Sequence, residues 1–429
     1  MKKQILIKKN VPQKFTFMPR LFYLILLPLV AMIGCSDSAT VPSPPGLEIV
    51  AEYEGGTLYK AGPVSVLKLQ GAYRQMGRQY GALLKDDLAA MYKLAVEEKM
   101  IEFYTKTLPP PRTYTEEAAW KRMAQVAEVV YAGYPPIYRE ILLGMAETSG
   151  LGLDKQKLLN IAELFKFLEM DVPPACSGMA AWRDFAGGGP LVFGRNNDDD
   201  AHIHKDMAKY TVVAVFHPDD GSIPAAIINY AGVMYAPTGM NRDGLFIELN
   251  SGNWTRYFPE RSSIIFTIQS MLHQYSTVAQ LEAPFKTVLA NISSIINVAD
   301  EMESLSYECY TDGRVKARGP DEPGLMAATN HFVDTSWGEI APPDSTTIAR
   351  RDNLLARARE SKGNIDADLM MKIFDLALLD KDGNVNPQGG ATVEGTIYQV
   401  VAVPRDRVLY LKAPGTFDWQ KMELKALLD

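Results

Sequence analysis

The spacing of apolar residues changes at Cys176, and this change divides the chain into two segments that must fold differently. Before it, apolar residues recur every three or four positions, which is typical of amphipathic helices. After it, short apolar runs alternate with turns such as Ala186-Gly-Gly-Gly189, which is typical of antiparallel strands joined by hairpins. The first segment is expected to form a strand over 64–70 and helices over 73–91, 116–132, 137–148 and 156–169.

The second segment predicts strands first, then helices, then strands again. This order favours an α+β fold in which helices cover antiparallel sheets. We therefore expect a mainly helical N-terminal segment over residues 63–175 and a sheet-rich segment over residues 176–429. The expected strands are 177–182, 190–195, 209–217, 224–230, 244–250, 324–329, 395–403 and 407–412, and the expected helices are 263–275, 276–291, 346–360 and 366–379.

Residues 1–34 have the pattern of an export signal. A basic start leads into the apolar run 21–33, which is too short to span a membrane, and Gly34 then precedes Cys35 as in a bacterial lipobox. We expect Cys35 to carry acyl chains such as palmitate, with residues 35–62 as a tether, so that the exported protein is anchored in the bacterial cell envelope, at the outer membrane. The alternative is a plain secretory signal in which Cys35 is incidental.

The charge of the chain argues against nucleic acid as a partner. Six of the 44 basic residues lie in residues 1–34, which contain no acidic residue, so the remainder carries 38 basic and 51 acidic residues. Nucleic-acid binding depends on basic surface, which such a chain lacks. The three cysteines provide no disulfide framework, and no motif calls for a cofactor.

Cys176 is the best candidate for a nucleophile, and a cysteine nucleophile needs a base. Among the five histidines, His331 beside Asn330 is the best candidate. The alternative base is the α-amino group of Cys176 itself, because a free α-amine has a pKa of about 7.7–8.0. That alternative requires cleavage between Ala175 and Cys176, which two preceding prolines could favour by restricting the backbone.

Several polar residues lie where they could serve such a nucleophile. A hairpin through the glycine turn returns Arg195 and Asp198 toward Cys176, as a cation and a carboxylate. Asn250 and Asn330 each end an apolar strand and could donate to an oxyanion. An arginine at the start of the 346–360 helix, Arg350 or Arg351, could support the site.

Together these segments resemble the N-terminal-nucleophile cysteine hydrolases, the group that includes penicillin acyltransferase, bile salt hydrolase, penicillin V acylase and acid ceramidase. Each motif is weak alone, but five occur in the expected order. They are the hairpin with Cys176, Arg195 and Asp198, then Met240–Gly244, Asn250, Thr329–His331 and Arg350. The first segment also resembles the acyltransferase branch of this group through Gly71–Gly81.

The resemblance implies a four-layer αββα sandwich and autocatalytic cleavage before Cys176. It implies attack of the Cys176 thiolate on the carbon–nitrogen bond of a linear N-acyl amide, followed by hydrolysis or acyl transfer. The oxyanion would be held by the Asn330 side chain and the backbone amide of Asn250. Trp254, Tyr257 and Phe258 are candidates for an acyl pocket.

Other interpretations remain open at this stage. The chain could be a surface binding lipoprotein that kept the fold without catalysis, or a Cys-His-Asn thiol hydrolase that uses His331 and is never cut. Asp198-Asp-Asp200 with His202 and His204 could bind a metal, although an acidic loop is the plainer interpretation. The sequence does not define the oligomeric state.

Overall fold

The computed structural model describes residues 44–162, 164–169, 176–234, 237–253, 257–258, 261–338 and 346–429. The predicted signal, the acylated Cys35 and the Ala175 side of the predicted cut lie outside the described residues. The chain divides into residues 1–42 and 43–429, and every element described below belongs to the second unit. Over the described ranges, no helix combines the length and apolar character needed to cross a membrane.

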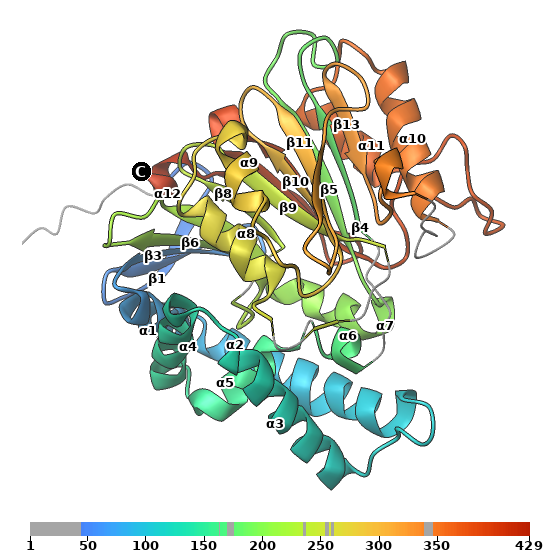
Figure 1. The fold of residues 1–429 in the computed structure, drawn as a ribbon. Helices are drawn as coiled ribbons and strands as arrows, with labels where there is room; N and C mark the ends of the chain where they lie inside the picture. The colour runs from blue at the N-terminus through green and yellow to red at the C-terminus, as the bar shows by residue number, and fades with distance from the viewer. Residues whose placement is uncertain are drawn as a thin grey trace, which may run out of the picture. The chain divides into compact units, whose positions relative to one another are not determined.

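Two sheets form the centre of this unit (Figure 1). Neighbouring strands are antiparallel, except that β3 and β6 run parallel. The larger sheet contains, in spatial order, β1 (Glu48–Tyr53), β2 (Gly56–Ala61), β3 (Val64–Gly71), β6 (Thr211–Pro218), β7 (Ala225–Tyr230), β8 (Thr238–Asn241), β9 (Phe246–Ser251), β10 (Ser294–Ala299), β11 (Ser304–Cys309) and β12 (Val315–Arg318). The smaller sheet contains β13 (Leu325–Ala328), β4 (Cys176–Ala181), β5 (Val192–Asp198), β14 (Thr396–Val403), β15 (Val408–Ala413) and β16 (Phe417–Glu423).

Helices cover the outer faces of both sheets. On the smaller sheet, α10 (Thr347–Glu360) and α11 (Ala367–Asp375) bury a separate apolar cluster that includes Phe185 and Phe374. On the larger sheet, α1 (Tyr73–Leu83) lies against β2 and β3, and α8 (Ile264–Leu272) lies against β8 and β9. Between the sheets, the rings of Phe193 and Phe246 lie 5.0 Å apart. The expected αββα architecture is therefore confirmed.

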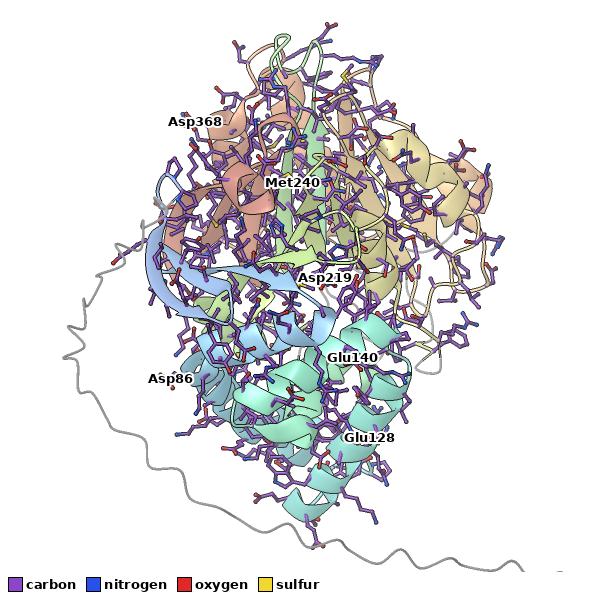
Figure 2. All side chains as sticks on the ribbon, turned by 90° about the vertical axis from the view of Figure 1, so that its left-hand side faces the viewer. Asp86, Glu128, Glu140, Asp219, Met240 and Asp368 are labelled. Carbon is purple, nitrogen blue, oxygen red and sulfur yellow. The ribbon has the colours of Figure 1, made fainter. Side chains whose placement is uncertain are left out.

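The segment before Cys176 is mainly helical, as expected. Besides α1 it contains α2 (Lys85–Met91), two π-helical stretches (Tyr92–Met100 and Phe103–Thr107), α3 (Glu116–Ala132), α4 (Pro136–Thr148), α5 (Gly152–Asn160) and α6 (Phe165–Glu169). Helices α1 and α4 are in close contact because Gly77 and Gly144 lack side chains. A Cβ on Gly77 would lie 2.1 Å from the Ile141 oxygen, and one on Gly144 would lie 2.1 Å from the Arg74 oxygen. Figure 2 shows the acidic residues Glu128 and Glu140 on the outside of this segment.

All of the predicted strands are present, but several other expectations were wrong. The predicted tether 35–62 includes β1 and β2, because Glu54 and Gly55 adopt positive φ and close a hairpin whose Leu58 and Ala61 are buried. The predicted helix 276–291 is limited to a 3₁₀ turn at Val278–Leu281 and the four-residue α9 (Glu282–Phe285). The helix predicted over 73–91 is split at Leu84, and the one over 156–169 separates into α5 and α6. The strands that were not predicted are β1, β2, β8, β10, β11, β12 and β16.

Candidate active site

Cys176 is the first residue of β4, and the hairpin to β5 places it beside the predicted cation. In the β4–β5 register, Cys176 lies opposite Asn197, and Gly178 lies opposite Arg195. The Nη2 atom of Arg195 is 3.8 Å from the Cys176 Sγ, and the thiol is 3.9 Å from the backbone oxygen of Asp198. The strand pairing therefore brings three of the predicted residues together at one end of the smaller sheet.

Asn330 and Arg350 hold the backbone of Cys176. The Cys176 N–H donates to the Asn330 Oδ1 at 2.9 Å, and Arg350 donates to the Cys176 oxygen at 2.6 Å and to the Asn330 Oδ1 at 2.8 Å. Arg351 instead donates to the Ala327 oxygen at 3.2 Å and pairs with Asp321. Of the two candidate arginines, only Arg350 reaches Cys176 through a described contact.

The Asp198 side chain is buried, and its two carboxylate oxygens have different surroundings. Its Oδ1 accepts from the Thr396 hydroxyl at 2.6 Å, whereas its Oδ2 has no hydrogen-bond partner among the described residues and lies 3.8 Å from Arg350. Burial raises the pKa of Asp198 to about 6, opposed by the charge of Arg350 and the Thr396 hydrogen bond. Such a carboxylate can accept a cation close to Cys176.

The side-chain amides of the two asparagines contact backbone oxygens. The Asn330 Nδ2 donates to the Ser251 oxygen at 2.8 Å, and the Asn250 Nδ2 lies 3.4 Å from the Ala328 oxygen. Both side chains are buried, and of the two Asn330 contacts Cys176 directly. In the uncut chain, therefore, Asn330 presents its oxygen rather than its N–H groups to Cys176.

Sequence reasoning missed Glu248, which holds Arg195 in place. Arg195 pairs with Glu248, donates to the Leu249 oxygen at 2.8 Å and donates to the Asn197 Oδ1 at 2.7 Å. Asn297 donates to the other oxygen of Glu248. A Cβ on Gly178 would lie 2.4 Å from the Glu248 Oε1, so glycine permits this approach. The sequence did contain one indication of this role: Glu248 is an acidic residue inside the apolar run 245–250, where a buried charge needs a partner.

The Cys176 thiol needs a base, and no described contact joins the His331 ring to it. Burial raises the pKa of Cys176 to about 12, although the charge of Arg195 opposes this effect, so the thiol in the uncut chain is protonated near neutral pH. The His331 ring is instead within reach of the hydroxyls of Thr329 (3.3 Å) and Thr347 (3.1 Å). Burial and nearby arginines lower the pKa of His331 to about 4. No hydrogen bond joins His331 to Cys176 in the part of the chain that the structure describes.

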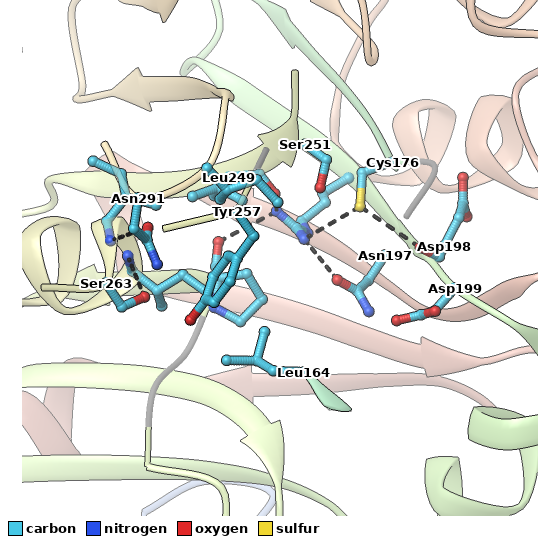
Figure 3. A pocket seen from close by; sticks show the side chains of 15 residues that line it. Leu164, Cys176, Asn197, Asp198, Asp199, Leu249, Ser251, Tyr257, Ser263 and Asn291 are labelled. Atoms are coloured by element: carbon cyan, nitrogen blue, oxygen red, sulfur yellow. Dashed lines mark hydrogen bonds between the residues drawn. The ribbon is translucent and has the colours of Figure 1, made fainter. Parts of the chain in front are cut away.

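A cavity of about 60 Å³ opens at the thiol (Figure 3). Tyr257 lines it, as expected of an acyl-pocket residue, whereas Phe258 lies under the guanidinium of Arg261 at 3.8 Å. Trp254 lies outside the described residues. The full lining is Leu164, Cys176, Arg195, Asn197, Asp198, Asp199, Pro237, Leu249, Ser251, Tyr257, Ser263, Ile264, Ile265, Asn291 and Ile292.

The acidic stretch after Asp198 makes contacts within the protein. Asp200 caps the short helix α7 (Ala201–His204) and pairs with Lys166 at 2.6 Å. His204 is buried 3.4 Å from Asp199, whereas His202 is largely exposed. Within the described ranges, no three His, Cys, Asp or Glu residues are grouped so that they could hold a metal ion.

Comparison with known proteins agrees with the resemblance noted from the sequence. The model of the acyl-coenzyme A:6-aminopenicillanic acid acyl-transferase family matches residues 185–416, more than half of the chain. No curated protein matches the chain.

Similar solved structures include three amide-cleaving enzymes. An N-acylethanolamine-hydrolysing acid amidase ortholog from Caenorhabditis elegans has 17% identity and a TM-score of 0.41, covering 58% of this chain and 100% of that one. A mutant conjugated bile acid hydrolase from Clostridium perfringens has 11% identity and a TM-score of 0.41, covering 59% and 94%. Penicillin V acylase from Agrobacterium tumefaciens has 12% identity and a TM-score of 0.39, covering 58% and 86%. The identification rests on the family model: the chain belongs to the acyl-coenzyme A:6-aminopenicillanic acid acyl-transferase family of N-terminal-nucleophile amide hydrolases and acyltransferases.

Proposed function

We propose that this protein is an exported, lipid-anchored amidohydrolase that cuts itself before Cys176 and then attacks linear N-acyl amides through the Cys176 thiolate. The observation that carries the proposal is the hydrogen bond from the Cys176 backbone nitrogen to the Asn330 Oδ1, at 2.9 Å. A cut at this position converts the same nitrogen into an α-amine that is already held beside the thiol. The amine then supplies the base that His331 does not.

The first chemical step transfers a proton from the thiol to the α-amine. The negative charge on sulfur is stabilised by Arg195, whose guanidinium is 3.8 Å away. The positive charge on the amine is balanced by Asp198, whose Oδ2 is within the same buried site. The folded protein thus already holds the charges of Arg195 and Asp198 in this site, and the cut adds the α-amine of Cys176 beside the thiol.

The thiolate then attacks the carbonyl carbon of the amide. A carbon–sulfur bond forms, the carbonyl becomes a tetrahedral oxyanion, and the ammonium of Cys176 returns its proton to the leaving nitrogen. The carbon–nitrogen bond breaks, the free amine departs and a thioester remains. Water attacks the thioester and releases the carboxylic acid, or a second amine accepts the acyl group and completes a transfer.

The oxyanion donors proposed for this step are the Asn330 side chain and the backbone amide of Asn250. Such donors are worth about 2.7–4 kcal/mol each when they are preorganised. The Asn330 amide group must turn from the Ser251 oxygen, its acceptor in the uncut chain, toward the oxyanion. Both residues lie at ends of rigid strands, which favours accurate placement.

Membrane anchoring is proposed from the sequence at Gly34-Cys35. We propose that Cys35 becomes the acylated first residue of the mature protein. A Cys35→Ala variant is then expected to lose attached acyl chains and to move from the membrane fraction to the soluble fraction. A wild-type protein without attached lipid by mass spectrometry would contradict this part of the proposal, while leaving the amidase chemistry untouched.

Intact-mass analysis of the purified protein tests the self-cleavage. Wild-type protein is expected as two chains that separate on denaturation, one of which begins at Cys176 and hydrolyses N-acyl amides. Cys176→Ala is expected to remain one inactive chain, whereas Cys309→Ser, which changes the other described buried cysteine, is expected to be cut and active.

Other outcomes favour the alternative interpretations. An uncut protein whose activity requires both Cys176 and His331 would indicate a Cys-His-Asn hydrolase. An uncut protein without activity toward any N-acyl amide would indicate a binding lipoprotein. Either result would overturn the proposed mechanism.

A further inference from the structure

Asp199 is the one residue of the three consecutive aspartates without a role so far. Asp198 contacts Thr396 and Arg350, and Asp200 caps α7 and pairs with Lys166. Asp199, by contrast, lines the same cavity as Cys176, and only 7% of its side chain is exposed. A carboxylate this enclosed carries a large desolvation cost unless a partner compensates it.

The cavity has two chemically different ends. Figure 3 shows Cys176, Asp198 and Asp199 on one side of the pocket, with Ser263 and Asn291 on the other and Tyr257 between them. Ile264, Ile265 and Ile292, which are sequence neighbours of Ser263 and Asn291, also line the cavity. The cavity therefore combines apolar side chains with a carboxylate that lies on the same side as Cys176.

The Asp199 carboxylate is held in position by its own backbone. Its N–H donates to the Gly395 oxygen at 2.8 Å, and a Cβ on Gly395 would lie 2.4 Å from the Asp199 oxygen. Its Oδ1 accepts from the N–H of Asp200 at 2.6 Å. A carboxylate fixed in this way can discriminate between ligands, because it does not need to be ordered when a ligand binds.

Two lysines near this stretch contact acceptors other than Asp199. Lys166 pairs with Asp200, and Lys205 donates to the Thr396 oxygen at 2.9 Å. Among the described residues, the His204 imidazole lies 3.4 Å from the Asp199 carboxylate. A cationic ligand in the cavity would therefore meet a carboxylate that no lysine or arginine of the described chain neutralises.

We propose that Asp199 is a specificity-determining residue that binds a positive charge on the amine part of the substrate, so that the preferred substrates are mono-N-acylated diamines. The inference rests on the proposed function. The acyl chain lies toward the isoleucines, the scissile carbonyl at Cys176, and the second, charged amino group of the diamine at Asp199. An uncharged amine part forms no ion pair with the carboxylate, and an anionic one is repelled by it.

The test compares three amides that share one acyl chain and differ only in the amine part. These are the amides of 1,4-diaminobutane, of the nearly isosteric pentylamine and of 4-aminobutyrate, each prepared with acyl chains from butanoyl to dodecanoyl. The cut wild-type enzyme is expected to favour the diaminobutane amide over the pentyl amide by about tenfold or more in kcat/KM, which corresponds to one charge-assisted contact.

Three substitutions at two neighbouring aspartates separate the roles. Asp199→Asn is expected to bring the ratio of the two kcat/KM values close to one, and Asp199→Lys to shift the preference toward the 4-aminobutyrate amide. Asp200→Asn removes a neighbouring carboxylate that pairs with Lys166, and is expected to retain the wild-type ratio. The ratio is informative because a general loss of activity cancels in it.

A further measurement needs no variant. Free 1,4-diaminobutane is expected to inhibit the wild-type enzyme competitively at concentrations about tenfold lower than pentylamine does. A wild-type enzyme that hydrolyses the pentyl amide as well as the diaminobutane amide, or an unchanged ratio in Asp199→Asn, would overturn the inference while leaving the proposed function intact. Failure of the cut enzyme to hydrolyse any of the amides would instead overturn the proposed function, and the inference with it.

Discussion

Arg195 and Glu248 form an ion pair whose two side chains are completely buried between the sheets. The pair joins β5 of the smaller sheet to β9 of the larger one, and it directs the guanidinium of Arg195 toward the Cys176 thiol. Burial raises the pKa of Glu248, while the charge of Arg195 and the contact with Asn297 oppose that effect. The pair therefore links the stability of the sandwich to the placement of its reactive cysteine.

Replacement of Glu248 by Gln is expected to destabilise the protein and to reduce its activity. Breaking one side of a buried ion pair typically costs about 3–5 kcal/mol, because the remaining charge loses its partner. Urea unfolding measures the change in free energy. Glu282→Gln serves as the control, since its pair with Lys286 is mostly exposed and its loss is expected to leave the stability close to that of wild type. Equal stability of the two variants would contradict the importance assigned to Glu248.

Adjacent arginines on α10 provide a matched pair of variants. Arg350→Lys removes the geometry that lets one guanidinium reach both the Cys176 oxygen and the Asn330 Oδ1. We expect slower cutting and a loss of about tenfold or more in kcat/KM, corresponding to at least one charged hydrogen bond. Arg351→Lys, which alters contacts to Ala327 and Asp321, is expected to be cut at close to the wild-type rate. Time-resolved gel analysis of cutting compares the two, and a larger defect in the Arg351 variant would reverse the assignment.

The activity of the cut enzyme is expected to rise with pH through about pH 6. Asp198 has its pKa raised to about 6, so it becomes an anion that can balance the Cys176 ammonium only above that value. The Thr396 hydroxyl stabilises the ionised form and lowers this pKa. Thr396→Val should therefore move the acidic limb of the kcat/KM profile to higher pH, whereas Thr396→Ser should retain it. An acidic limb that does not move in the valine variant would exclude Asp198 as its origin.

His331 is expected to be dispensable for cutting and for activity. Its ring is close to two threonine hydroxyls, and its lowered pKa of about 4 leaves it uncharged at neutral pH. His331→Ala should therefore yield the two-chain protein, with kcat/KM within a few-fold of wild type. Steady-state kinetics and intact mass provide the measurement. Complete loss of both properties, with a normal unfolding transition, would restore histidine as the base.

The Asn160 side chain joins the helical segment to residues 232–234. These residues precede Pro237, whose backbone oxygen accepts a hydrogen bond from Arg195. Its buried amide donates to the Gly232 oxygen at 2.9 Å and accepts from the Tyr134 hydroxyl at 3.1 Å and the Met234 N–H at 3.3 Å. Asn160→Ala is expected to destabilise the protein by about 1–3 kcal/mol, since buried groups lose partners. The cut chains should then separate at lower urea concentration by size-exclusion chromatography. The exposed Asn364→Ala is the control and is expected to behave as wild type.

Site residues that are close to one another in the sequence could be predicted, whereas contacts between distant strands could not. The Cys176–Arg195–Asp198 arrangement was predictable because a single hairpin with a glycine-rich turn fixes its register. Glu248 and Thr396 were missed because their contacts depend on how one sheet faces the other and on which distant strand lies beside β5. No local pattern encodes that pairing.

The same distinction applies to the fold. Helices α10 and α11 have the length and periodicity that sequence patterns detect. The β1–β2 hairpin was assigned to the tether because its outer strand is largely exposed and follows a stretch rich in serine and proline. Its burial comes from β3 and α1, which a local window does not include.

The parallel pairing of β3 with β6 determines what a cut before Cys176 can change. Residues 65–71 lie in register with residues 212–218, so three strands from the first segment are continuous with the sheet built by the second. A cut between these segments removes a covalent connection but no strand from the sheet. The mature enzyme would thus be an obligate two-chain protein, whose first chain is a permanent structural subunit rather than a propeptide that is discarded.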